Sequence, residues 1–270
     1  MTTTLADKQP QTHPLFVGIL HSEWIKIRSV RSTVWTLVAM VGVTIGLSAL
    51  ATFAIASSWH HMPLVERMSF DPANLSLSGM SLGQLSIGVL GIIIFTSEFA
   101  TGTIRSTFAA VPSRPRVLAA KAIVFGAIVL VISEAVAFVS FFLGQAILSG
   151  KTPTTTLGHP GVLRIVIGSG LYLTILGLVA LGIGVIIRHT AGAIATFVGL
   201  VMVLPLLVLL LPHSITNDIN RFLPSTIVSV VARIVPPPRT FSPWIGLLVF
   251  FGYAVALLVI GGWTLVKRDA

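Results

Sequence analysis

Few side chains in this 270-residue sequence are arranged as catalysis would require. A nucleotide-binding P-loop has a glycine, four further residues and then Gly-Lys-Ser/Thr, because its backbone N–H groups must wrap the phosphates. Residues 149–152 read Ser-Gly-Lys-Thr, but Gln145 stands where the first glycine is needed. We therefore predict that the chain has no catalytic residues and no nucleotide site of its own.

Histidine could in principle supply a metal site. His60 and His61 are adjacent in the sequence and precede Met62. Imidazole is a common metal ligand, but no ligand spacing accompanies this pair, and neighbouring side chains on a helix point apart. We expect these to be solvated loop histidines, and we expect no metal.

One acid lies where a charge is costly. Glu134 stands inside the apolar stretch 131–136, and a charge at the centre of a bilayer costs roughly 2.5–3.5 kcal/mol on insertion scales. We expect its carboxyl group to be protonated, or to hydrogen-bond with hydroxyls such as those of Ser86, Ser133 or Thr174. Two interpretations stay open: a polar point on a translocation path or subunit interface, or a tolerated buried acid.

The composition requires a membrane protein to position these residues. Apolar residues make up 54% of the chain and charged residues 9%, with a mean hydropathy of +0.98. Soluble domains carry about 25% charged residues. The formal charge of +9 could suggest nucleic acid, but the basic residues stand singly or in small groups between apolar runs, so we expect no nucleic-acid partner.

Six apolar stretches are long enough to cross a membrane as helices, which takes about 20 residues each. They cover 33–57, 79–97, 122–148, 163–187, 191–211 and 243–266. They are apolar on every face, so helices satisfy their backbone groups where an alternating barrel pattern is missing. We predict an all-α integral membrane protein with one transmembrane domain over 14–270, after a disordered cytoplasmic tail over 1–13.

The basic residues also predict the orientation. Most of the 17 Lys and Arg residues fall in segments that lie on one side when six spans are threaded through a membrane. The positive-inside rule places that side, and with it both termini, in the cytoplasm. We therefore expect a multi-pass protein of the bacterial plasma membrane.

Residues 15–31 have an amphipathic pattern that indicates a helix lying in the headgroup layer. Its apolar positions recur at helical spacing: Phe16, Ile19, Leu20, Trp24, Ile27 and Val30. We expect Glu23, Lys26 and Arg28 on the opposite, polar face, with Arg31 at the end of the segment.

Two connecting segments have patterns of their own. In the loop 98–121, Ile104, Phe108 and Val111 lie at i, i+4 and i+7, and Pro112 and Pro115 follow. This predicts a short amphipathic helix whose exposed Ile104 and Phe108 would need a partner's groove. In the last outer loop, the apolar stretch 219–235 is interrupted by a proline, which predicts a broken, re-entrant or gate-like helix.

Three regions of the sequence resemble permease subunits of type-2 ATP-binding-cassette (ABC) exporters, especially those of high-GC Gram-positive bacteria. The first is SEWIKIRSVRST at 22–33, and the second is SEFATGTIRST at 97–107, continuing through Pro112, Arg114 and Lys121. The third comprises FLPS at 222–225, FSPW at 241–244 and the ending VKRDA at 266–270.

The resemblance implies a division of labour. The permease would pair with a separate ABC ATPase, which holds ATP and Mg, and with a second copy of itself or a related permease within the membrane lipid. A coupling helix in the first cytoplasmic loop would dock on the ATPase. The residues implied at this dock are Glu98, Thr101, Gly102, Thr103, Ile104, Arg105 and Phe108. The helix at 15–31 would be the family's interfacial elbow, and the broken outer segment its external gate.

The function that we predict is the permease of an ATP-driven exporter for a hydrophobic or amphipathic substrate. The alternatives are a proton-coupled secondary transporter that uses Glu134, and a membrane-embedded enzyme or assembly factor. A secondary transporter predicts further midplane acids and internal repeats. The sequence shows one such acid and no convincing repeat.

Overall fold

The computed structural model describes residues 16–111, 113–210, 212, 216, 219–234 and 240–267, without the side chain of Ser32. The predicted tail over 1–13, Pro112, the prolines at 236–238 and the chain ending at 268–270 lie outside the described residues. The described part consists of helices and the turns that join them, with no strand, which confirms the all-α fold.

Six helical segments in this part are long and apolar enough to cross a membrane, as the sequence predicts. They are α2 (Arg31–Ser58), α5 (Met80–Ala100), α7 (Arg114–Leu148), α8 (Val162–Ile187), the pair α9 (Thr190–Val198) and α10 (Leu204–Val208), and α13 (Pro243–Lys267). The shorter helices are α1 (Phe16–Ser29), α3 (Leu64–Met68), α4 (Pro72–Ser76), α6 (Thr103–Ala110) and α12 (Pro224–Val231).

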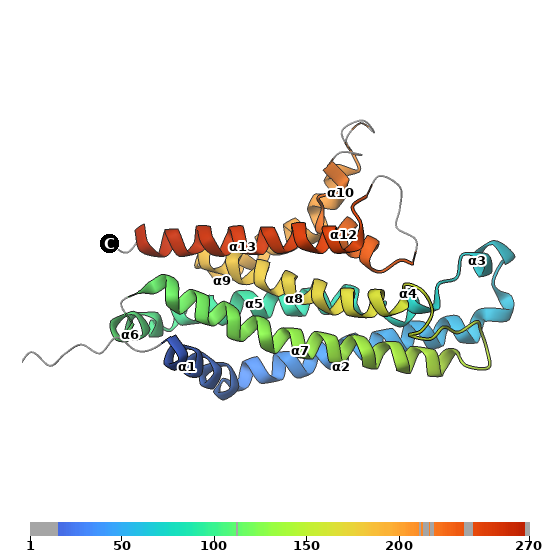
Figure 1. Cartoon of the computed structure of the whole chain (residues 1–270), viewed down its shortest axis with the longest axis horizontal. Coiled ribbons are helices and arrows are strands. Elements are labelled where there is room, and N and C mark those ends of the chain that lie inside the picture. The colour runs from blue at the N-terminus through green and yellow to red at the C-terminus, as the bar shows by residue number, and fades with distance from the viewer. Residues whose placement is uncertain are drawn as a thin grey trace, which may run out of the picture.

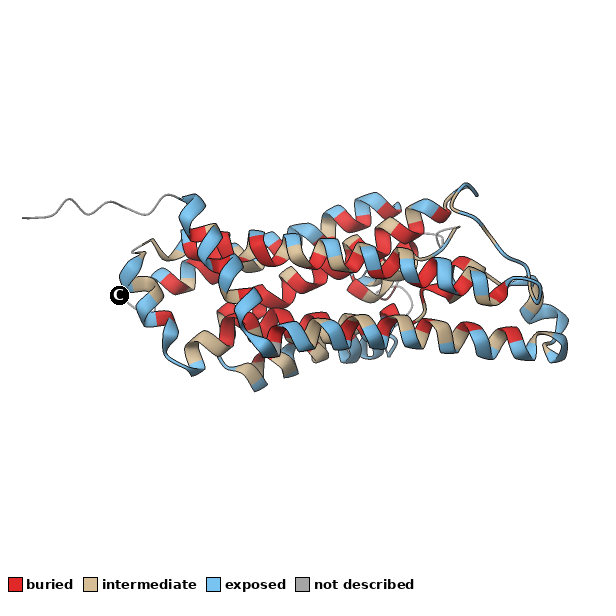
Figure 2. Cartoon of the chain, turned by 90° about the horizontal axis from the view of Figure 1, so that it is seen from below, coloured by how far each residue is buried: buried red, intermediate tan, exposed pale blue. Residues whose placement is uncertain are grey.

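The long helices lie side by side along the long axis of the molecule (Figure 1). Helix α8 is central: it packs against α5, α7 and α13, and most of its residues are buried. The other spans carry one buried stripe and an exposed apolar face, as Figure 2 shows. Helices α1 and α6 and the last turn of α13 share one end of the bundle, which we call the α6 end, and α3 lies at the other.

Glycines allow α5 and α8 to approach closely. A Cβ atom on Gly91 of α5 would lie 2.5 Å from the carbonyl oxygen of Gly177 in α8, which is too short for any real contact. Because hydrocarbon provides no hydrophobic drive between helices, such close backbone packing is a main source of attraction in a membrane. The α5–α8 contact therefore depends on the absence of side chains at these positions.

The fifth span is bent where the sequence places a proline. Gly199–Val203 form a π-helical turn between α9 and α10, directly before Pro205. Proline has no N–H group, and its ring clashes with the carbonyl four residues earlier, so a widened turn relieves the clash. The turn between α8 and α9 is tight: Arg188 adopts a left-handed φ of 59°, and the His189 ring accepts the Gly192 N–H.

Helix α12 occupies the predicted broken outer segment. It begins at Pro224, a residue type that suits the first turn of a helix, and it packs against α8 and α13 through Ile227, Val230 and Val231. Its eight residues are too few to span a membrane, in agreement with the sequence analysis.

Substituting Gly91 with alanine should destabilise the protein by about 1–3 kcal/mol, because the added methyl group forces α5 away from α8. Gly46→Ala is the matched control, since a Cβ at Gly46 of α2 meets no atom within 4 Å. Melting temperatures of the purified variants in detergent provide the measurement. Equal melting temperatures for the two variants would contradict the close approach.

Candidate functional site

Helix α6 lies across one end of the bundle and is connected to α5 by a two-residue turn. Gly102 adopts a left-handed φ of 73°, a conformation that glycine adopts without steric cost. At the other end of α6, Val111 is extended, as expected for a residue that precedes proline. Pro115 stands in the first turn of α7, so it begins the next helix and does not end α6.

The apolar residues of α6 face the protein's own bundle. Ile104 is 5% exposed, and Phe108 packs against the core with the guanidinium of Arg114 5.3 Å from its ring. The prediction that Ile104 projects outward is therefore wrong, because the end of the bundle covers it, whereas Phe108 is half-buried and lines an open pocket. The predicted dock residues that do face outward are Thr101, Gly102, Thr103 and Arg105.

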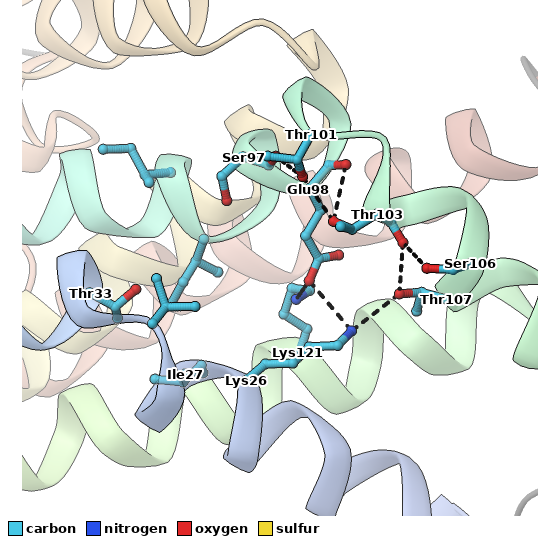
Figure 3. Close-up of a pocket in the computed structure, with 13 residues that line it drawn as sticks. Lys26, Ile27, Thr33, Ser97, Glu98, Thr101, Thr103, Ser106, Thr107 and Lys121 are labelled. Carbon is cyan, nitrogen blue, oxygen red and sulfur yellow. Dashed lines mark hydrogen bonds and ion pairs between the residues drawn. The ribbon is translucent and has the colours of Figure 1, made fainter.

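A cluster of four charged residues lies beside α6 and joins three helices. Figure 3 shows three of them, Lys26, Glu98 and Lys121. We call Glu23, Lys26, Glu98 and Lys121 the four-charge cluster. Lys121 of α7 lies 2.5 Å from a Glu23 oxygen on α1 and 2.8 Å from Glu98 Oε1 on α5. Lys26 lies 2.7 Å from Glu23 Oε1 and 3.5 Å from Glu98 Oε1.

The cluster also reaches α6. The Lys26 ammonium donates a hydrogen bond to Thr107 Oγ1 at 3.2 Å, and Thr103 Oγ1 donates to the Glu98 carbonyl at 3.5 Å. Helices α1, α5, α6 and α7 are thus joined by polar contacts within one small region. A displacement of α6 would have to break these contacts or move its neighbours with it.

The charges of the cluster balance, with two carboxylates facing two ammonium groups. Glu23 is fully buried, and Lys121 is 2% exposed. Burial lowers the pKa of Lys26, but hydrogen bonds and charge interactions with Glu23 and Glu98 outweigh this and raise the pKa above its usual 10.5. Lys26 is therefore cationic throughout the physiological pH range.

Glu98 is satisfied on one side only. Its Oε1 atom accepts from both lysines, whereas its Oε2 atom is buried and has no hydrogen-bond partner among the described residues. A buried charged acceptor without a partner is costly. Glu98 therefore points into the cluster, not toward a docking partner, and it retains an unused acceptor.

Glu23 lies on the face of α1 opposite to the predicted one. The buried stripe of α1 is Ile19, Glu23 and Ile27, whereas Trp24 and Arg28 are exposed. The periodicity of α1 assigned Glu23 to the polar face, because periodicity within one helix cannot show that Lys121 lies opposite Glu23 on another helix. The available signal was a lysine at the start of an apolar span, which needs a counter-charge when that span packs.

Glu134 is half-buried on α7 and lies against α8, where a Cβ on Gly170 would meet its carboxyl carbon at 2.6 Å. Neither carboxyl oxygen has a hydrogen-bond partner among the described residues, so the predicted bonds to Ser86, Ser133 or Thr174 are wrong. The Thr174 hydroxyl instead donates to the Gly170 carbonyl one turn earlier in its own helix, a local bond that such residues often form.

The P-loop-like segment lies at the end of α7 remote from the four-charge cluster. Gln145 donates to the Pro72 carbonyl and to Ser76 Oγ, each at 3.0 Å, and accepts the Thr155 N–H at 2.8 Å. This side chain therefore braces α4 and a loop against α7. Nowhere in the described ranges do three or more His, Asp or Glu side chains gather in a way that could hold a metal ion.

The fold and this site define a multi-pass helical membrane protein with a short helix held across one end. A family model described as "ABC-2 family transporter protein" matches residues 19–206, which include most of α1, all of α6 and the four-charge cluster. The match covers more than half of the chain, so the chain belongs to the ABC-2 family, as a permease subunit of an ABC transporter. No curated protein matches it.

Removing one member of the cluster should be costly. Lys121→Met leaves Glu23 buried without its closest cation, and breaking such a pair typically costs about 3–5 kcal/mol. Lys151→Met, at an exposed position remote from the cluster, is the matched control. We expect a lowered melting temperature for Lys121→Met alone.

The double variant Glu23→Gln with Lys121→Met tests the cause. Removing both buried charges should restore much of the lost stability, because no uncompensated carboxylate remains at Glu23. If Lys121→Met melts with the control, or if the double variant is no better than the single one, the ion pair does not hold α1 in place.

Proposed function

We propose that this chain is the membrane-spanning half of an ATP-driven exporter in the bacterial plasma membrane, and that it moves a hydrophobic or amphipathic substrate outward. Membership of the ABC-2 family supports the permease role and implies a separate ATPase partner. ATP and Mg would be bound by that partner, and this chain would supply the path through the membrane.

One observation carries this proposal: α6 is fixed to the bundle on one face and is polar and exposed on the other. Ile104 and Phe108 hold α6 against the spans, and the four-charge cluster ties it to α1, α5 and α7. Arg105 is exposed on the outer face. A push delivered by the ATPase to that face would pass to three helices together.

The distribution of charge supports a cytoplasmic location for the α6 end. Lys26, Arg28, Arg105 and Lys267 belong to α1, α6 and the last turn of α13, all of which lie at this end (Figure 1). Positive residues flanking spans stay on the cytoplasmic side during insertion. Both ends of the chain then belong to the same compartment as the ATPase.

The far part of the fifth span supports pairing with a second permease, either another copy or a related chain. Helix α10 projects from the rest of the bundle (Figure 1), and Leu206, Leu207, Leu209 and Leu210 are 54–81% exposed there. Such an apolar surface needs cover from lipid or from another protein. A facing permease would cover it and enclose an apolar path.

Arg105→Glu should abolish co-purification with the ATPase and reduce ATP-dependent efflux strongly, because it reverses the charge on the exposed face of α6. Lys151→Glu makes the same reversal at the other end of α7 and should leave both unchanged. The measurement is pull-down of the co-expressed ATPase, followed by efflux from vesicles. ATPase binding by Arg105→Glu at the level of the control would overturn the dock at α6.

We propose for Glu134 a place beside the path of the substrate, since both carboxyl oxygens lie unbonded between α7 and α8. Glu134→Gln and Glu134→Ala should then lower efflux while ATPase binding is kept. Two variants with wild-type efflux would leave Glu134 as a tolerated buried acid. Efflux that needs no ATP and is lost in both would favour the proton-coupled alternative.

A further inference from the structure

An open pocket of about 610 Å³ lies beside the four-charge cluster, between α1, the start of α2, the end of α5 and α6 (Figure 3). Its lining has two different parts. Ile27, Val30, Ile93 and Ile94 form an apolar wall. Lys26, Glu98 and the hydroxyls of α6 form a polar end.

The pocket lies beside the end of the span α5, next to polar groups of α6. Its apolar wall comes from the last turns of the span α5 and from the junction of α1 with α2. Its polar end belongs to α6 and to the charges at the end of the bundle. Val30 is 45% exposed and the Lys26 side chain 37% exposed, so the pocket opens to its surroundings. An amphiphile lying along the spans would match both parts.

The polar end of the pocket is complementary to a head group that carries both an anion and a hydrogen-bond donor. Lys26 has one long contact, at 3.5 Å to Glu98, which an anionic oxygen could replace. Glu98 Oε2 itself is sealed from solvent, but the Glu98 side chain is 12% exposed, so its carboxylate can face a cationic donor in the pocket. A group that carries both an anion and a donor would satisfy the two residues at once.

The charge balance of the four-charge cluster further restricts which head groups fit the pocket. The cluster is neutral, so an added anion without its own cation would face the carboxylates of Glu23 and Glu98 unbalanced. A zwitterion keeps the balance. Its cation must also bear hydrogens: a primary ammonium has three donors, whereas a quaternary ammonium has none to offer Glu98.

We propose that this pocket binds a zwitterionic phospholipid with a primary ammonium head group, namely phosphatidylethanolamine. Its ammonium pairs with the Glu98 carboxylate, its phosphate accepts from Lys26, and an acyl chain lies along Ile27, Val30 and Ile94. The bound lipid bridges α1 and the end of α5, the helix from which the chain continues into α6. This site stands independently of the export function.

Native mass spectrometry of the delipidated full chain, offered lipids with identical acyl chains, tests the head-group preference. Phosphatidylethanolamine should be retained about tenfold better than phosphatidylcholine or phosphatidylglycerol, the factor that one hydrogen bond to a charged group provides. Glycerophosphoethanolamine, which has the head group without chains, separates a lipid site from a site for the soluble group. Equal retention of the three lipids, or full competition by the soluble group, would overturn the proposal.

Val30→Trp fills the pocket without touching a charge and should remove the preference. Val34→Trp is the matched control, because Val34 is similarly exposed on α2 but does not line the pocket. A preference that survives in Val30→Trp would place the lipid elsewhere and refute the site. No ATPase or substrate enters this measurement, so its failure leaves the exporter proposal standing, and loss of ATPase docking leaves this result standing.

Discussion

The buried ion pair between Glu23 and Lys121 sets the position of α1 relative to the rest of the bundle. Neither charge could stay away from water alone, so α1 and α7 can be buried against each other only in the register that brings the two groups together. Glu98 then accepts a second hydrogen bond from Lys121, which adds α5 to the same arrangement. The position of α6 follows, because only two residues separate it from the end of α5.

Two kinds of force hold this molecule together, and they act at different depths. Apolar side chains in the spans are solvated as well by lipid as by protein. The close backbone approach at Gly91 and Gly177 therefore holds α5 against α8. At the α6 end, paired charges and hydroxyls replace glycine contacts. The attraction between these opposite charges is strong because burial removes water from around them. Their burial is tolerated because each charge has an opposite charge within contact distance.

The difference between the spans and the α6 end also explains which features could be predicted from the sequence. Bilayer thickness dictates the length of an apolar run, so the six spans were recognisable without knowledge of their contacts. The spacing of Ile104 and Phe108 predicted a helix but not its cover, since periodicity identifies an apolar face and not the surface that meets it. The predicted position of Glu23 on the polar face was wrong for the same reason, because its partner Lys121 is remote in sequence and lies on another helix.

Glu98 lies inside the four-charge cluster, and this bears on how the proposed dock at α6 would work. A helix that merely touched an ATPase could slide over the bundle and transmit nothing, whatever the affinity of the dock. Here the apolar face of α6 is buried, and the last turn of α5 is anchored by Lys26 and Lys121. If the ATPase docks on the outer face of α6, as we propose, transmission depends on the residues that hold the inner face of α6 and the end of α5 at least as much as on Arg105.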